Sequence, residues 1–253
     1  MNIELIVFDM AGTTVADQHE VEACFAQAAR QTGLRVSDEA ILAAQGLAKR
    51  FVFQQFWRSQ LGQNHPEVEA NVDVSYAVFK EILENHYQTQ PVFPTEGCLE
   101  TFAWLRQQNI KVALTTGFYR VVTDIILERL GWLDGLDENR VGNQNTLIQA
   151  SIASDEVPAG RPQPFMIQKA MHLLGVSDPQ RVVNLGDTPS DLQSGAAAGV
   201  LCNIGLVNGT HSEAQLEPHP HHVLLASLKD LPAFLQTTYG ALLSPKTDWQ
   251  MAK

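Results

Sequence analysis

The sequence predicts an α/β protein with a doubly wound, Rossmann-like parallel sheet and a helical cap inserted after the first strand. Short apolar runs rich in β-branched residues alternate with amphipathic helical patterns, as is typical of strands buried on both faces. Between residues 19 and 87 the pattern is helical throughout, and a linker flanks it on each side. We therefore expect an α/β core formed by residues 1–16 and 95–253, and a cap formed by residues 17–94.

The first expected strand leads directly to a carboxylate. The apolar run over residues 3–8 ends at Asp9, after which the chain breaks at Ala11 and Gly12 and becomes polar. In open α/β sheets the reacting groups lie just past the carboxyl ends of the strands. Asp9 is therefore a candidate nucleophile or metal ligand, and the alternative is a turn or helix-capping residue.

The helical segment contains four expected helices. Apolar residues recur at helical spacing over 21–29, and Gly33 ends that helix. Ser37 caps the second helix, and the third covers 50–61. The fourth begins at 65–66 and continues through Leu83.

The core resumes after a second linker at residues 90–94. Helical and strand patterns then alternate, which predicts a parallel sheet with crossover helices. The expected helices cover residues 96–108, 119–130, 164–174 and 195–198, and the expected strands cover 110–114, 147–153, 181–185, 201–206 and 223–225.

Composition narrows the range of partners. The net charge of −11 argues against a general nucleic-acid or anionic-membrane surface. Cys24, Cys98 and Cys202 are far apart, which indicates a reducing compartment without a disulfide framework. The N-terminus lacks the basic flank of a signal peptide, and no apolar run reaches membrane-spanning length. We expect a soluble, cytoplasmic protein that acts on a small molecule.

Polar residues follow several of the expected strands. Because the carboxyl ends of parallel strands meet at one edge, we expect Asp9, Thr116, Arg161 and Asp187 to lie close together. Two carboxylates suit a Mg²⁺ ion, and an arginine offers a planar fork to phosphate oxygens. The Thr116 hydroxyl and the Gly117 N–H can bind the same phosphate. This set suits phosphoryl transfer, with Asp9 attacking phosphorus.

Each of these residues also has a structural alternative. Asp187 can cap a helix, Arg161 can lie on the surface beside prolines, and Thr116 can be a strand-end hydroxyl. Lys49 precedes an amphipathic helix, where a lysine is usually solvated. The histidines between His211 and His222 lie in a proline-broken segment, which we expect to be exposed and not to bind metal.

Four stretches resemble the haloacid dehalogenase superfamily: the strand ending at Asp9 and residues 114–117, 160–162 and 186–191. Their order and spacing fit over nearly the whole chain. The resemblance is closer still to the phosphonatases. Ala11 stands where most superfamily members have an aspartate acid/base, and Arg161 stands where most have lysine.

The resemblance implies the roles of the metal-site residues. It implies that Asp9 is the nucleophile and that Asp9, the Ala11 carbonyl and Asp187 surround Mg²⁺. Asp191 matches the last acidic position of the superfamily motif. The resemblance implies that it contacts the metal through a water or supports a residue that binds the metal. A homodimer formed through the cap is also favoured.

The resemblance further implies that Thr116, Gly117 and Arg161 bind phosphate. The cap segment from Gly46 to Lys49 resembles the one whose lysine forms a Schiff base in phosphonatases. The chain departs from the phosphonatase pattern by having Gln45 where a methionine precedes that lysine.

A second departure is Val52, which stands where a histidine follows the lysine. That histidine helps with proton transfer around the imine, so its absence bears on the identity of the substrate.

Ala11 and Lys49 together suggest the reaction. Without an acid at position 11, the leaving group must be activated in another way, and an iminium on Lys49 would draw electrons from a C–P bond. We expect a Mg²⁺-dependent hydrolase that cleaves phosphonoacetaldehyde or a related carbonyl phosphonate. The alternatives are a phosphomonoester phosphatase acting on a small metabolite and a weakly catalytic phosphate-binding protein.

Overall fold

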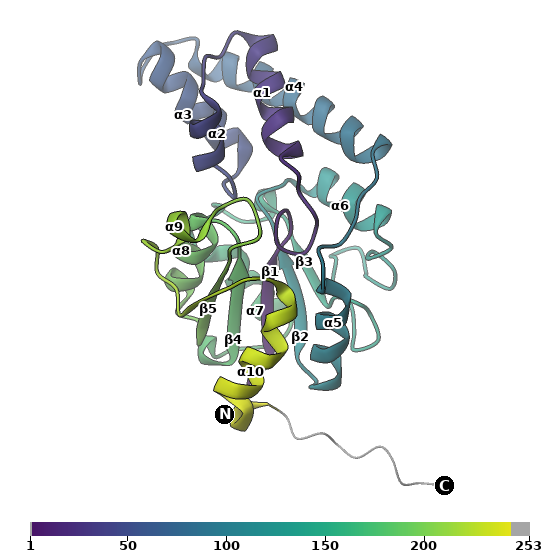
Figure 1. Ribbon diagram of the computed structural model, residues 1–253. Coiled ribbons are helices and arrows are strands. Elements are labelled where there is room, and N and C mark those ends of the chain that lie inside the picture. The colour runs from purple at the N-terminus through teal and green to yellow at the C-terminus, as the bar shows by residue number, and fades with distance from the viewer. Residues whose placement is uncertain (1, 244–253) are drawn as a thin grey trace, which may run out of the picture.

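A computed structural model describes residues 2–243 and contains a six-stranded parallel sheet of order β3-β2-β1-β4-β5-β6 (Figure 1). All six strands lie within or beside the predicted segments, and the predicted fold class is confirmed. The strands are β1 (Leu5–Asp9), β2 (Lys111–Thr115), β3 (Ala150–Ile152), β4 (Val182–Gly186), β5 (Cys202–Leu206) and β6 (Val223–Leu225).

The sheet register brings the reacting strand ends together. β1 is central and pairs with β2 on one side and β4 on the other. Asp9 lies opposite Thr115, and Phe8 lies opposite Leu185. The loops after these strands therefore start at the same level, although they are far apart in the sequence.

Helices cover both faces of the sheet. Because side chains alternate along a strand, Leu5 and Val7 face a core that includes Met166, whereas Ile6 and Phe8 face the larger core. The covering helices are α5 (Cys98–Gln107), α6 (Arg120–Arg129), α7 (Phe165–Leu173), α8 (Pro189–Ala198), α9 (Glu213–Leu216) and α10 (Leu231–Tyr239). Helices α9 and α10 were not predicted from the sequence.

Five helices lie between β1 and β2 in the chain, and Figure 1 places the first four of them at the end of the molecule beyond the carboxyl ends of the strands. We call them the cap helices: α1 (Glu20–Thr32), α2 (Asp38–Ala43), α3 (Lys49–Leu61) and α4 (Val68–Thr89). Their centre is aromatic. Phe25 stacks on Phe53 with ring centroids 4.1 Å apart, and Phe79 packs against both. We retain residues 17–94 as the proposed extent of the cap.

The two linkers of the cap lie side by side. Ala16 N donates to the Phe93 carbonyl at 2.9 Å, and Thr95 N donates to the Thr14 carbonyl at 3.0 Å. The Tyr119 hydroxyl, just before α6, donates to Glu84 of α4 at 2.7 Å. The cap helices are therefore tied to the core at the linkers and along α4.

No helix within residues 2–243 is both long enough and apolar enough to span a bilayer.

The aromatic cluster predicts a position-dependent loss of stability. Phe53→Ala should lower the free energy of unfolding by roughly 3–5 kcal/mol, because it leaves a cavity beneath Phe25 and Phe79. Phe51→Ala on the same helix, where the side chain is 46% exposed, should change it by less than about 0.5 kcal/mol. Urea unfolding followed by circular dichroism checks both values. If both substitutions lowered the free energy of unfolding equally, the core of the cap helices would not be centred on Phe53.

Candidate active site

Asp9 lies at the carboxyl end of β1 and is almost fully buried. Its Oδ1 accepts a hydrogen bond from Arg161 Nη1 at 2.5 Å, while its carbonyl accepts one from the Thr14 hydroxyl at 2.8 Å. Burial raises the pKa of Asp9 well above its usual range, and the positive charge of Arg161 opposes that shift. The carboxylate is thus held beside one cation in a largely dry site.

Asp187 follows β4 and is completely buried. Its Oδ1 accepts from the Thr13 hydroxyl at 2.9 Å, and its Oδ2 accepts from Thr210 N at 2.7 Å and from Thr210 Oγ1 at 2.8 Å. Burial raises the pKa of Asp187 to about 6, and the nearby Asp191 adds to the shift. The N-cap of α8 is Thr188, so the helix-capping interpretation of Asp187 is wrong.

Asp191 lies in the first turn of α8, where it forms a capping box with Thr188. Its Oδ2 accepts from Thr188 N at 3.0 Å and from Thr188 Oγ1 at 2.6 Å. Its Oδ1 lies 2.8 Å from Arg161 Nε. Asp191 therefore braces the loop after β4 with one oxygen and turns the other toward the arginine.

These three carboxylates fit a cation. Asp9, Asp187 and Asp191 each offer one oxygen, and these oxygens lie within 4.8 Å of one another. Arg161 is the positive charge in contact with two of them, so the buried cluster keeps an excess of negative charge. Carboxylate oxygens are the donors that Mg²⁺ prefers, and a divalent cation would offset both the burial of these carboxylates and their mutual repulsion, which raise the pKa values of Asp9 and Asp187. Ala11, whose carbonyl is an expected ligand, lines the same cavity as Asp9.

Arg161 is buried, so the interpretation as a surface side chain is wrong. Besides its contacts with Asp9 and Asp191, its Nη2 donates to the Thr115 carbonyl at 3.0 Å and to Thr115 Oγ1 at 2.7 Å. These contacts fix the guanidinium beside the proposed nucleophile.

Thr116 and Gly117 follow β2 and border the same cavity. Thr116 Oγ1 accepts a hydrogen bond from Phe118 N at 3.1 Å, which shapes the turn. A Cβ built on Gly117 would lie 2.7 Å from the Gly46 carbonyl oxygen. Only glycine lets the loop before α3 approach this turn so closely.

Lys49 begins α3 and is 6% exposed, so the solvated interpretation of this lysine is wrong. Its Nζ donates to Gln45 Oε1 at 2.9 Å. Burial lowers the pKa of Lys49 to about 8, although Asp17, Glu22 and Asp9 oppose the shift. A larger fraction of this amine is therefore neutral near pH 7 than of an ordinary lysine.

Lys49 lines one cavity together with Asp9 and Thr116. The volume of this cavity is about 20 Å³, which is room for about one water molecule. Residues of the cap helices and of the core thus enclose little free space over the strand ends, and we expect that the cap must move before a substrate can enter.

Several residues of this site were not predicted from the sequence. Asp17, expected only as the first residue of the cap, is half-buried and lines the cavity, and burial together with Glu20 raises its pKa to about 8. Thr210 supports Asp187 from a segment without any motif. His211 follows it and is 3% exposed, so the expectation of exposure is wrong for this histidine.

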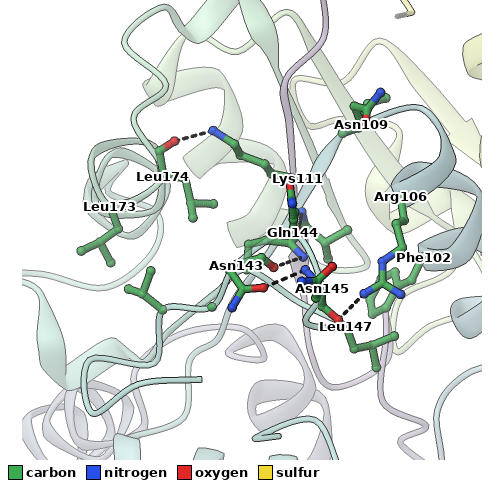
Figure 2. A pocket seen from close by; sticks show the side chains of 15 residues that line it. Phe102, Arg106, Asn109, Lys111, Asn143, Gln144, Asn145, Leu147, Leu173 and Leu174 are labelled. Atoms are coloured by element: carbon green, nitrogen blue, oxygen red, sulfur yellow. Dashed lines mark hydrogen bonds between the residues drawn. The ribbon is translucent and has the colours of Figure 1, made fainter. Parts of the chain in front are cut away.

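A larger pocket of about 750 Å³ lies at the other end of the sheet (Figure 2). It includes Lys111, the first residue of β2, whereas the residues just described follow the last residue of that strand. The Lys111 ammonium donates to the Leu174 carbonyl at 2.6 Å, and Arg106 donates to the Thr146 carbonyl at 3.1 Å. Both cations are thus engaged by backbone, and the catalytic candidates do not line this pocket.

Comparison with known proteins decides the family. A family model for haloacid dehalogenase-like hydrolases matches residues 3–199. The chain belongs to this family. Phosphonoacetaldehyde hydrolase of Bacillus cereus strain AH187 is 31% identical over 228 residues, which cover 83% of this chain and 78% of that protein.

Solved structures share the fold. A phosphonoacetaldehyde hydrolase-like protein of Oleispira antarctica has a TM-score of 0.76 at 19% identity, and the match covers 96% of this chain and 94% of that protein. A predicted phosphoglycolate phosphatase of Haemophilus somnus 129PT has a TM-score of 0.70 at 17% identity, and the match covers 92% of this chain and 98% of that protein. At these identities the two likenesses support the fold alone. Family membership makes this haloacid dehalogenase-like chain a hydrolase.

The carboxylate cluster predicts that Mg²⁺ stabilises the protein. At about 100 times its Kd, Mg²⁺ should add about 2.7 kcal/mol to the free energy of unfolding of EDTA-treated protein, because the ion binds the folded cluster. Asp187→Asn should lose most of this gain, whereas Asp134→Asn, at an exposed position, should keep it. Thermal unfolding with and without Mg²⁺ measures the effect. If Mg²⁺ stabilised Asp187→Asn as much as wild type, the ion would bind at another site.

Proposed function

We propose that the protein is a Mg²⁺-dependent hydrolase that cleaves the C–P bond of a small carbonyl phosphonate, with phosphonoacetaldehyde as the first candidate. The observation that carries this proposal is the burial of Lys49 in the cavity that Asp9 also lines. Ala11 supplies no acid for an oxygen leaving group, whereas a buried amine with a lowered pKa is suited to attack a carbonyl.

In the proposed reaction the neutral Lys49 amine adds to the substrate carbonyl, and loss of water gives an iminium. An Asp9 oxygen then attacks phosphorus, while the electron pair of the C–P bond moves into the iminium to form an enamine. Protonation of the enamine carbon and hydrolysis release the aldehyde or ketone product and restore Lys49. Water finally hydrolyses the aspartyl phosphate.

The other residues position the phosphoryl group. Arg161, held beside Asp9, and the Thr116–Gly117 turn are the proposed donors to its oxygens. Asp9, Asp187 and the Ala11 carbonyl would hold Mg²⁺, with Asp191 next to them. Bound Mg²⁺ would supply positive charge against the phosphoryl oxygens and the attacking carboxylate. Closure of the cap excludes water from the amine and the iminium.

A phosphomonoester phosphatase is the second candidate, and Asp17 is the observation that favours it. This carboxyl group lines the cavity, and its pKa of about 8 keeps it largely protonated at pH 7. It could therefore protonate an ester oxygen in place of the acid that Ala11 lacks. Membership of a hydrolase family favours both candidates over a weakly catalytic phosphate-binding protein.

Borohydride trapping tests the leading proposal. Reduction in the presence of phosphonoacetaldehyde should leave a covalent adduct on Lys49, found by peptide mass, and phosphate should be released only with Mg²⁺. Lys49→Arg should abolish the adduct and lower C–P cleavage at least about 10³-fold, because it removes the covalent route. Lys80→Arg, on cap helix α4, should retain both. Phosphate release from esters without any adduct would favour the phosphatase.

The pKa of Lys49 predicts the pH dependence of adduct formation. The amine attacks only when neutral, so trapping by cyanoborohydride should rise about tenfold per pH unit below pH 8 and level off above it. The titratable groups that act on the pKa of Lys49 are Asp17, Glu22, Asp9 and Arg161.

Nα-acetyl-lysine, measured in parallel, controls for the pH dependence of the reductant itself. A rise that continues to about pH 10.4, the ordinary value for lysine, would contradict a desolvated amine.

A further inference from the structure

Gln45 is the direct partner of Lys49 in the closed cavity. It lies between α2 and α3, is 6% exposed and lines the cavity. Its Oε1 accepts the hydrogen bond from Lys49 Nζ at 2.9 Å. Because a lysine ammonium can only donate, this contact fixes the orientation of the amide, and Nε2 is turned away from Lys49.

The Nε2 group of Gln45 is a buried donor without a partner among residues 2–243. Buried amide donors are nearly always paired, because an unpaired one loses its hydrogen bonds to water without replacement. Gln45 lines the cavity that also contains the proposed nucleophiles, so its unpaired donor is available to an oxygen atom of a ligand.

The backbone around Gln45 is held by helix α2 on one side and by the core on the other. Gln45 N donates to the Leu42 carbonyl at 3.0 Å, and the Gln45 carbonyl accepts from the Ser190 hydroxyl at 3.5 Å. A Cβ on the following residue, Gly46, would lie 2.3 Å from Ser190 Oγ. The Gln45 amide is therefore placed over the cavity when the cap is closed.

We propose that Gln45 binds the carbonyl oxygen of the substrate through Nε2, while its Oε1 holds the Lys49 amine next to the carbonyl carbon. The assignment rests on the function proposed above and narrows it. One amide would thus contact both the attacking nitrogen and the oxygen that receives the electron pair.

The chemistry of addition uses both ends of this amide. Lys49 Nζ forms a bond to the carbonyl carbon, the C=O pair moves to oxygen, and Nε2–H stabilises the developing negative charge. Transfer of a proton from Nζ to this oxygen gives the carbinolamine. A second proton, from the Asp17 carboxyl group that lines the cavity, lets the hydroxyl leave as water while the nitrogen lone pair forms the iminium.

The assignment also defines what the site selects. A phosphonate without a carbonyl oxygen leaves Nε2 unpaired, and sites built to hydrogen-bond an oxygen discriminate strongly against analogues that lack it. Gln45 therefore favours carbonyl phosphonates over alkyl phosphonates of similar size.

Two substitutions test whether Gln45 binds the substrate carbonyl or only positions Lys49. Gln45→Met removes both the donor and the acceptor. Gln45→Glu keeps an acceptor for Lys49 and removes the donor, and its negative charge also raises the pKa of Lys49. Each variant, at its own pH optimum, is measured for kcat/KM with phosphonoacetaldehyde and for the Ki of ethylphosphonate, which lacks the carbonyl. Both variants should lower kcat/KM about 10- to 100-fold and raise Ki far less.

Gln55→Met, at an exposed position of α3, is the matched control and should leave both constants unchanged. Thermal unfolding of each variant checks that the cap remains folded. If Gln45→Glu keeps the kcat/KM of wild type, or if kcat/KM and Ki change by the same factor, the assignment of Gln45 is overturned. If wild type cleaves no carbonyl phosphonate and forms no adduct, the proposed function fails, and this assignment fails with it.

Discussion

The accumulation of buried negative charge around one arginine is the constraint on which the rest of the site depends. Asp9, Asp187 and Asp191 approach within 4.8 Å, and Arg161 contacts two of them. Such a cluster is stable only where hydrogen-bond donors and cations surround it. The loops after the neighbouring strands β1, β4 and β5 supply the hydroxyl and N–H donors, and the segment after β3 supplies Arg161, so the parallel sheet is what makes the cluster attainable.

The same crowding explains the composition of the loops. A Cβ on Gly12 or Gly209 would lie 2.3 Å from an Asp187 side-chain atom, and Gly12 also has a φ of +86°. Gly117 is needed for a different contact, the approach of the cap loop at Gly46. Glycines therefore stand where the backbone must approach the carboxylates or the cap, and threonines such as Thr13 and Thr210 supply the donors.

Local patterns were sufficient to predict the strands, because strands buried on both faces read as continuous apolar runs. They also placed Asp9, Arg161 and Asp187 at one edge, since topology alone brings the ends of parallel strands together. The surroundings of Lys49 were not predictable in this way. Three features depend on how the cap packs against the core: the burial of the Lys49 amine, the unpaired amide of Gln45 and the position of Asp17 in the cavity. This packing joins residues far apart in the sequence, and no periodic pattern in the sequence indicates it.

The pairing of the two cap linkers also bears on how the chain folds. β1 and β2 are adjacent in the sheet, but the whole cap separates them in the sequence, so their pairing closes a long loop. The entropy lost on closing a loop grows with its length, and folding slows as contacts become less local. Helices α1 and α4 pack together and bring Ala16 and Phe93 into contact. Early assembly of these two helices would shorten the effective loop, which makes the cap a folding aid for the sheet as well as a cover for the site.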